Sequence, residues 1–147
     1  MLKSILGVIV GYVGMAIFSF AAFTCAYLAL GVERVFEAES YDVSTIWMVI
    51  MIVLSLIGGI LGGLICAAIS KSKGACMAFA VIVLVLGIIV GVMTKMKEAP
   101  ETARTGDVPN LQAMQMAQTP TWLCFLTPVL GAAGVLLGAR MKKLPAP

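Results

Sequence analysis

Histidine is absent from this chain of 147 residues, and charged side chains make up only 12% of it. Imidazole is the commonest metal ligand and a frequent general base. Its absence excludes histidine-ligated haem, zinc or copper and a Ser-His-Asp triad built from this chain alone. A soluble domain has about 25% charged residues, so the low charge argues against a water-soluble fold.

Paired cysteines are also missing. The four cysteines Cys25, Cys66, Cys76 and Cys124 form no CxxC pair, so neither a zinc knuckle nor a thioredoxin-type motif is predicted. We interpret them as small apolar residues within helices, with free thiols. A bridge between Cys25 and Cys124 stays open, because both fall near the same predicted end of the bundle.

Long apolar runs dominate what is present. No charged residue occurs in the 24 positions from Ile46 to Ile69 or in the 19 from Ala75 to Met93. As helices these runs would be roughly 36 and 28 Å long, against a hydrocarbon core of about 30 Å. The short basic turn 70–74 between them predicts an antiparallel membrane hairpin whose helices lie side by side.

Two further spans complete the predicted fold. The uncharged run from Ile5 to Leu30 is too long for a signal-peptide core of about 7–15 residues, and a last span starts at Trp122 with Pro128 expected to kink it. We therefore predict an all-α polytopic membrane protein, an antiparallel bundle of four transmembrane helices in one domain covering 1–147. The expected helices are 4–31, 44–70, 74–94 and 121–140, with an outer loop over 95–120.

The hydrophilic segments leave alternatives open. Residues 31–43 carry Glu33, Glu37, Glu39 and Asp42, but they lack the regular spacing of a calcium loop. We favour a solvated acidic loop and predict no metal site and no cofactor. Residues 109–118 are either a short interfacial helix, with Leu111 and Met114 on one face, or an irregular loop.

Small residues four apart recur in every predicted span. Such pairs form a flat stripe along which two helix backbones can approach closely in lipid. We predict helix packing at ten glycines: Gly7, Gly11, Gly58, Gly59, Gly62, Gly63, Gly87, Gly91, Gly134 and Gly138. Because one stripe would be left facing lipid in a closed bundle, we also expect a stable assembly with the Gly58–Gly63 stripe at a helix contact.

Aromatic residues and charges suggest how the chain sits in a membrane. Tyr27, Trp47 and Trp122 lie near predicted helix ends and are expected as membrane-interface anchors. One side of the bundle collects six Lys or Arg residues and no acidic residue, and the other collects four Lys or Arg and all seven acidic residues. The positive-inside rule then predicts a multi-pass protein with both termini in the cytoplasm, and we expect the membrane to be a bacterial cytoplasmic membrane.

Function is constrained mainly by exclusion. No ionisable Asp, Glu, Lys or Arg lies within the predicted spans, so the membrane carboxylate that small multidrug exporters and rotary-ring subunits need is missing. The chain resembles small four-helix proteins of bacterial inner membranes. Hydroxyl groups at membrane depth come from Tyr12, Ser19, Thr24, Ser55 and Thr127; they either line a pore, bond across helices or bond to their own helix backbone.

Two functional hypotheses remain, and neither is an enzyme. The first is a structural or accessory subunit that packs against other membrane protein chains, in a larger complex or a homo-oligomer. The second is a small oligomeric channel or transporter for a neutral solute. The expected partners are the lipid bilayer and other membrane chains. Nucleic acid is not expected, because the basic residues form no extended face.

Overall fold

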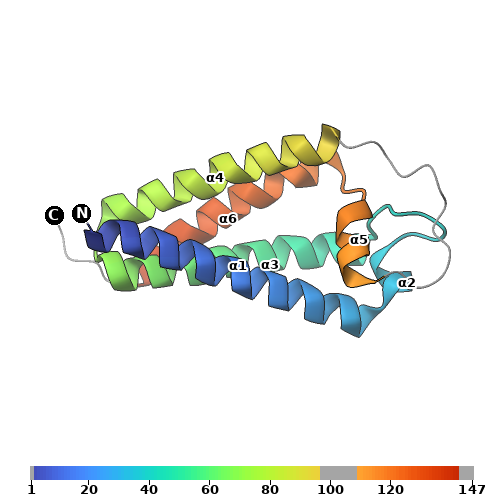
Figure 1. Ribbon diagram of the computed structural model, residues 1–147, viewed down its shortest axis with the longest axis horizontal. Coiled ribbons are helices and arrows are strands. Elements are labelled where there is room, and N and C mark those ends of the chain that lie inside the picture. The colour runs from blue at the N-terminus through green and yellow to red at the C-terminus, as the bar shows by residue number, and fades with distance from the viewer. Residues whose placement is uncertain (1, 97–108, 143–147) are drawn as a thin grey trace.

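The computed structural model describes residues 2–96 and 109–142 and confirms an all-α bundle with four helices long and apolar enough to span a membrane (Figure 1). The long helices are α1 (Leu2–Leu30), α3 (Thr45–Ser70), α4 (Lys73–Met96) and α6 (Thr121–Met141). Two short helices, α2 (Val32–Val35) and α5 (Asn110–Met116), lie at one end. The start of α1 and the end of α6 both lie at the opposite end (Figure 1).

The two ends of the bundle differ in charge. The basic end holds the start of α1, the turn between α3 and α4, and the end of α6, and its described charges are Lys3, Lys71, Lys73, Arg140 and Lys142. The acidic end holds α2, α5 and the loop before α3, with Glu33, Glu37, Glu39 and Asp42. Charged residues are absent from the described spans between these ends, as a bilayer core requires.

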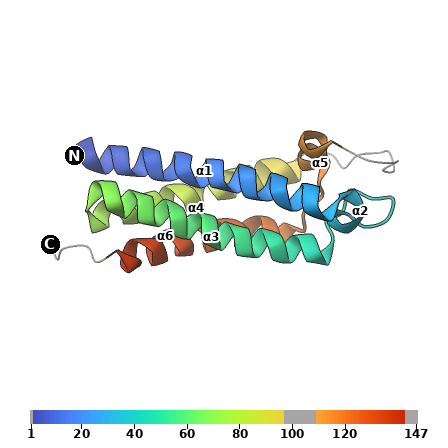
Figure 2. The ribbon, with the colours of Figure 1, turned by 90° about the horizontal axis from the view of Figure 1, so that it is seen from below.

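The helices form an open arc in the order α1, α3, α6, α4. Both views show α1 running beside α3 and α4 beside α6 (Figures 1 and 2), and α3 packs most extensively on α6 and α1. The two helices of the predicted hairpin, α3 and α4, contact each other far less, so the prediction that they lie side by side along their length is wrong. A short turn fixes only their adjoining ends, and glycine contacts decide the neighbours beyond it.

The two overlapping glycine pairs of α3 face two different helices. A Cβ atom on Gly58 would lie 3.2 Å from Ser19 Oγ of α1, and one on Gly62 would lie 3.2 Å from the carbonyl oxygen of Gly11. One residue further along, Gly59 abuts the backbone of α6. Successive residues in a helix point about 100° apart, so two offset pairs give α3 two flat faces.

The remaining glycine pairs also lie at contacts within the chain. Gly7 and Gly11 face α3, Gly134 and Gly138 face α3 from α6, and Gly87 and Gly91 face Pro128 and Cys124 of α6. The expectation that one stripe would be left facing lipid is therefore wrong. It rested on a closed bundle with one face per helix, whereas α3 uses two faces and both paired glycines of α4 face α6.

Side-chain and backbone caps set the ends of α3. Ser44 Oγ accepts a hydrogen bond from the Trp47 amide at 3.2 Å and donates one to the Arg34 carbonyl, so it joins the helix start to α2. Lys71 ends the helix in the left-handed region, at φ 50°, with its amide bonded to the Ala67 carbonyl at 3.1 Å. The first amides and the last carbonyls of a helix have no partner further along the helix, so such bonds stabilise its two ends.

The loop between α1 and α3 folds into a compact cap at the acidic end, formed by residues 31–44 and 117–120. Phe36 pairs with Val43 in an antiparallel bridge, and Asp42 pairs with Gln118 in a parallel one. Its apolar core consists of buried residues: Tyr27, Val32, Val35, Phe36, Tyr41, Val43 and Trp47. The cap therefore ties the segment before α6 to the segment before α3.

Two of the three expected interface anchors are part of that core. Tyr27 and Trp47 are 7% and 8% exposed and meet edge to face with ring centroids 6.4 Å apart. The cap covers both rings and leaves them little surface for contact with lipid head groups. Trp122, at the start of α6, is 56% exposed, and its role as an anchor stays a prediction.

Candidate functional site

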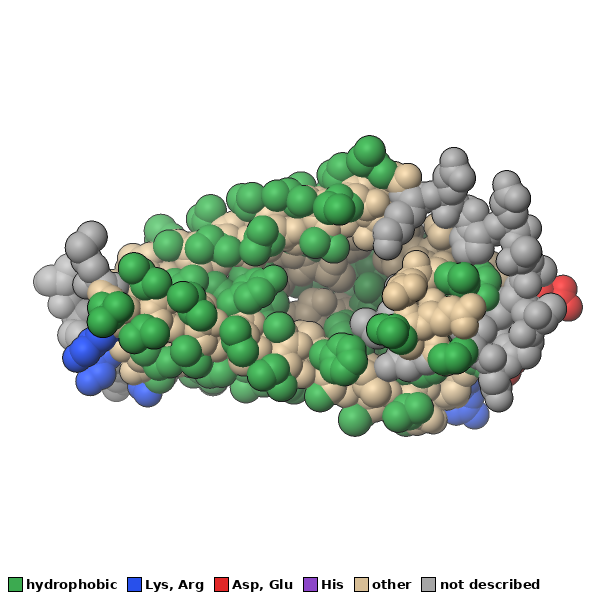
Figure 3. All heavy atoms as spheres, viewed as in Figure 1, with side chains coloured by type: hydrophobic (Ala, Val, Ile, Leu, Met, Phe, Trp, Pro, Cys, Tyr) green, Lys and Arg blue, Asp and Glu red, His purple; other side chains and the backbone are tan. Residues whose placement is uncertain are grey.

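A cavity lies where α1 and α4 diverge towards the acidic end. Its volume is about 350 Å³, and in Figure 3 the surface between the two helices is hollowed. Ligand pockets commonly fall between 300 and 1,000 Å³, with apolar walls and a few polar groups. We call it the seam cavity, because it opens at the seam between α1 and α4, the ends of the helix arc.

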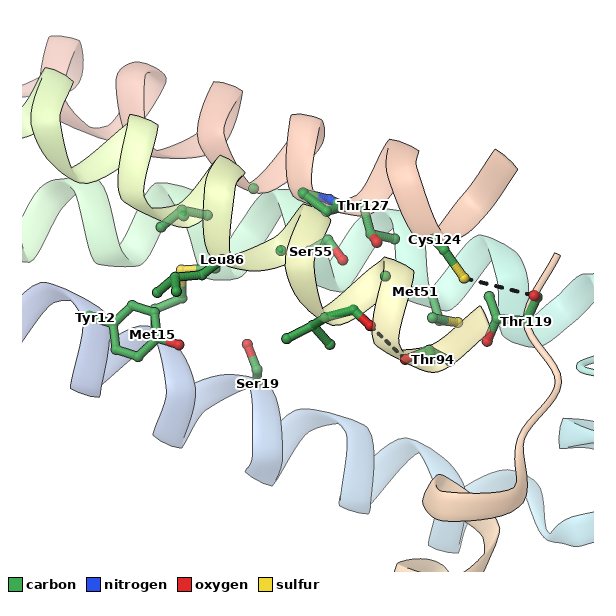
Figure 4. Close-up of a pocket in the computed structure, with 16 residues that line it drawn as sticks. Tyr12, Met15, Ser19, Met51, Ser55, Leu86, Thr94, Thr119, Cys124 and Thr127 are labelled. Atoms are coloured by element: carbon green, nitrogen blue, oxygen red, sulfur yellow. Dashed lines mark hydrogen bonds between the residues drawn. The ribbon is translucent and has the colours of Figure 1, made fainter. Parts of the chain in front are cut away.

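All four long helices contribute a hydroxyl to the wall of the seam cavity. Figure 4 shows Ser19 of α1, Ser55 of α3, Thr94 of α4 and Thr127 of α6 around one space. The sequence had marked three of these as polar groups at depth, together with Tyr12, which also lines the cavity. Thr24 does not line it.

The two threonines bond to their own helices. Thr94 donates to the Val90 carbonyl at 2.9 Å and Thr127 to the Leu123 carbonyl at 3.1 Å. A hydroxyl that donates keeps two acceptor lone pairs. Ser19 and Ser55 make no hydrogen bond with any residue that the structure describes, so their hydroxyls can both donate and accept.

Pro128 adds a further acceptor. It lies inside α6 and has no amide hydrogen, so it cannot donate to the carbonyl of Cys124 four residues earlier. That carbonyl abuts Gly91, where an added Cβ would be 3.1 Å from its oxygen, and both residues line the cavity. The glycines of α4 thus leave room for the proline and its freed carbonyl.

The remaining wall is uncharged and largely apolar. Met15, Met51, Val83, Leu86 and Val90 supply most of it, and the flexible thioether side chains suit ligands of irregular shape. The lining includes no Asp, Glu, Lys or Arg. Lys95, beyond the wall at the acidic end, donates to the Thr119 carbonyl and so ties α4 to the segment before α6.

The cavity ends in a packed core towards the basic end. Phe79 is fully buried, and its ring lies beside Gly11 and Gly62, where an added Cβ would come within 3.2 and 3.3 Å. The buried residues around it form one apolar cluster: Cys66, Ala67, Cys76, Ala80, Val83, Val135 and Ala139. The seam cavity is therefore a pocket closed at one end within the described residues.

The cysteines do not pair as the sequence had left open. All four are free; Cys25 is exposed and Cys124 is buried, on helices that are not neighbours. Sequence reasoning missed instead the approach of Cys66 and Cys76, whose sulfur atoms lie 3.8 Å apart. Their positions on either side of the basic turn were the available signal.

The acidic loop is held by its own hydrogen bonds. Ser40 Oγ donates to Asp42 Oδ2 at 2.8 Å and accepts from the Asp42 amide at 2.9 Å. Over residues 2–96 and 109–142, no three carboxylate or thiol side chains converge on one point as metal ligands would. Comparison of the chain with protein-family models, with curated proteins and with solved structures finds no match.

Proposed function

We propose that the protein binds a neutral, mostly apolar molecule with a hydroxyl-bearing head in the seam cavity. The observation that carries the proposal is an uncharged cavity, open at the seam, with one hydroxyl from each of the four long helices at its wall. Because the seam lies between two membrane-length helices, the molecule enters from the bilayer. The proposal contains no catalytic step.

The polar groups define what the head must offer. Thr94 and Thr127 already donate to carbonyls, so towards a ligand they act as acceptors. Ser19 and Ser55 act in either sense. A free alcohol or phenol satisfies both kinds of partner, whereas a charged head would lie unpaired in a site of low dielectric.

The test is a comparison of lipids that co-purify with two variants of α3. Ser55→Phe fills the cavity from its wall, and Val53→Phe places the same side chain on the exposed face of the same helix. A neutral lipid enriched in wild type and in Val53→Phe, but lost from Ser55→Phe, supports the proposal. Equal lipid content in both variants, or no enrichment in the wild type, contradicts it.

A transporter for a neutral solute is the related alternative. Its support is the same uncharged cavity, and movement across the membrane would require the contacts around Phe79 to open. Flux of a neutral solute into liposomes that contain the protein, absent from empty liposomes, would favour this alternative. Binding of a lipid without flux favours the first proposal.

An accessory subunit remains a second proposal, favoured by the position of α1. This helix packs on α3 along one side, and most residues around the rest of its surface are not buried by the chain. A partner membrane chain would cover that face. Co-purification of a fixed set of proteins from native membranes, abolished by Ile9→Lys but not by Val81→Lys on exposed α4, would support it. We also propose that the protein lies in a bacterial cytoplasmic membrane with both termini in the cytoplasm.

A further inference from the structure

A second cavity lies at the basic end, between the start of α4 and the end of α6. It has a volume of about 670 Å³ and is lined by seven residues: Lys73, Cys76, Met77, Leu136, Ala139, Arg140 and Lys142. We call it the basic groove. It is separate from the seam cavity, with which it shares no lining residue.

The basic groove holds unpaired positive charge. Lys73, Arg140 and Lys142 make no ion pair with any carboxylate of residues 2–96 and 109–142. Every described acidic side chain lies at the other end of the bundle, so no acidic side chain of the described residues neutralises them. Three cations around one concave space attract an anionic group more strongly than an isolated surface charge does.

Polarity in the groove changes with depth. Lys73 and Arg140 lie at the ends of their helices, and Met77 and Leu136 lie four residues deeper, about 6 Å further into the bundle. Met77 is 63% exposed and Leu136 is 38% exposed, so both present apolar surface to a ligand. Cations at the rim above an apolar floor match a phosphate head joined to hydrocarbon chains.

We propose that the basic groove binds an anionic phospholipid, with its phosphate at Lys73, Arg140 and Lys142 and an acyl chain against Met77 and Leu136. Basic pockets between transmembrane helices recognise such head groups by charge-assisted hydrogen bonds. The guanidinium of Arg140 can hold two phosphate oxygens at once. A free phosphate would meet the same cations but would leave the apolar floor unused.

Native mass spectrometry of the full chain in mild detergent tests the proposal. The protein is mixed with phosphatidylglycerol or with phosphatidylcholine, and bound lipid is counted. We expect wild type to retain phosphatidylglycerol at least about tenfold better than phosphatidylcholine, because the choline ammonium cancels the charge of the phosphate and is repelled by the three cations of the groove. Equal retention of the two lipids overturns the proposal without any variant being needed.

A pair of double variants locates the site. Lys73→Gln with Arg140→Gln removes two charges from the groove, and Lys3→Gln with Lys71→Gln removes two charges from the same end outside it. We expect about tenfold weaker phosphatidylglycerol binding in the first and less than about twofold in the second. Equal losses would show that general surface charge attracts the lipid, and would overturn the assignment.

Competition separates lipid from free phosphate. Inorganic phosphate is added to the complex of wild type with phosphatidylglycerol at equal molar concentration. Retention of the lipid supports recognition of head and chain together. Displacement of the lipid by phosphate would mean that the groove recognises phosphate alone, and would contradict the phospholipid assignment.

Discussion

Gly59 of α3 and Gly134 of α6 lie so close that a Cβ atom on Gly134 would be 3.0 Å from the Cα atom of Gly59. The contact is between two helix backbones, with no side chain between them. Lipid provides no hydrophobic driving force for helix association, because its chains are as apolar as the side chains. Such backbone contacts supply instead the van der Waals attraction that holds the helices together. The α3–α6 pair is the most extensive helix contact of the described chain.

A methyl group at this interface should destabilise the fold. In Gly63→Ala the new Cβ would meet backbone atoms of Val135, which cannot rotate away. Overpacking of this kind costs about 1–3 kcal/mol, so the thermal unfolding midpoint in detergent should fall. Gly74→Ala is the control, since its nearest neighbour would be Ser72 Oγ at 3.8 Å. Equal midpoints for the two variants would contradict the interface.

Loss of the helix cap at Ser44 should weaken the start of α3. Ser44→Ala removes the acceptor for the Trp47 amide and the donor to the Arg34 carbonyl. We expect a loss of about 0.5–2 kcal/mol in the free energy of unfolding. Thr45→Ala, one residue along and exposed, should change the unfolding midpoint little. Unfolding is followed by tryptophan fluorescence, to which Trp47, buried near the start of α3, contributes.

Thiol reactivity should follow burial. In folded protein in mild detergent, a maleimide should modify Cys25 first, because the other three side chains are buried. Cys66 and Cys76 should react only after denaturation, and all four should then be modified. Peptide mass spectrometry assigns the sites. A disulfide-linked peptide joining positions 25 and 124, or early labelling of Cys66, would disagree with the structure.

Topology can be tested at two exposed positions. Gly74→Cys lies at the basic end and Ala38→Cys at the acidic end, each placed in a chain whose native cysteines are replaced by alanine. The charge distribution predicts that a membrane-impermeant thiol reagent on intact cells labels position 38 and spares position 74. The reverse labelling pattern would invert the orientation.

Hydropathy alone was enough to predict four helices. Runs such as Ile46 to Ile69 offer no charge to lipid, and in a bilayer every backbone amide must be bonded within the segment, which leaves the helix as the solution. The prediction of secondary structure was therefore strongest in the apolar runs, where the lipid environment favours the helix. The predicted boundary 44–70 and the observed Thr45–Ser70 differ by one residue at one end.

The arrangement of those helices was harder to predict. The turn at Lys71 suggested that α3 and α4 pair along their length, but their glycine stripes pack on other helices. Nothing in hydropathy separates Gly58 from Gly59, although they face different neighbours. The packing of Tyr27 and Trp47 was hard to predict for a similar reason, because a ring near a helix end can pack against lipid head groups or against a folded loop.

The candidate site was visible only as scattered hydroxyls. Ser19, Ser55 and Thr127 are far apart in sequence, and each alone fits a bond to its own helix. Only the three-dimensional order of the helices brings them around one space. The freed carbonyl of Cys124 was predictable from the sequence, since Pro128 four residues later has no amide hydrogen to donate. The sequence did not indicate that this carbonyl would face Gly91.

The open seam between α1 and α4 has a thermodynamic consequence for any occupant. A molecule reaching the seam cavity from the bilayer exchanges with the hydrocarbon phase and not with water. The occupancy of the cavity then depends by mass action on the concentration of the ligand within the membrane. The relevant dissociation constant is therefore expressed as a mole fraction of membrane lipid. A ligand that is scarce in the cell but concentrated in the membrane would fill the site even with modest affinity. The occupied fraction of the site would therefore change with the lipid composition of the membrane.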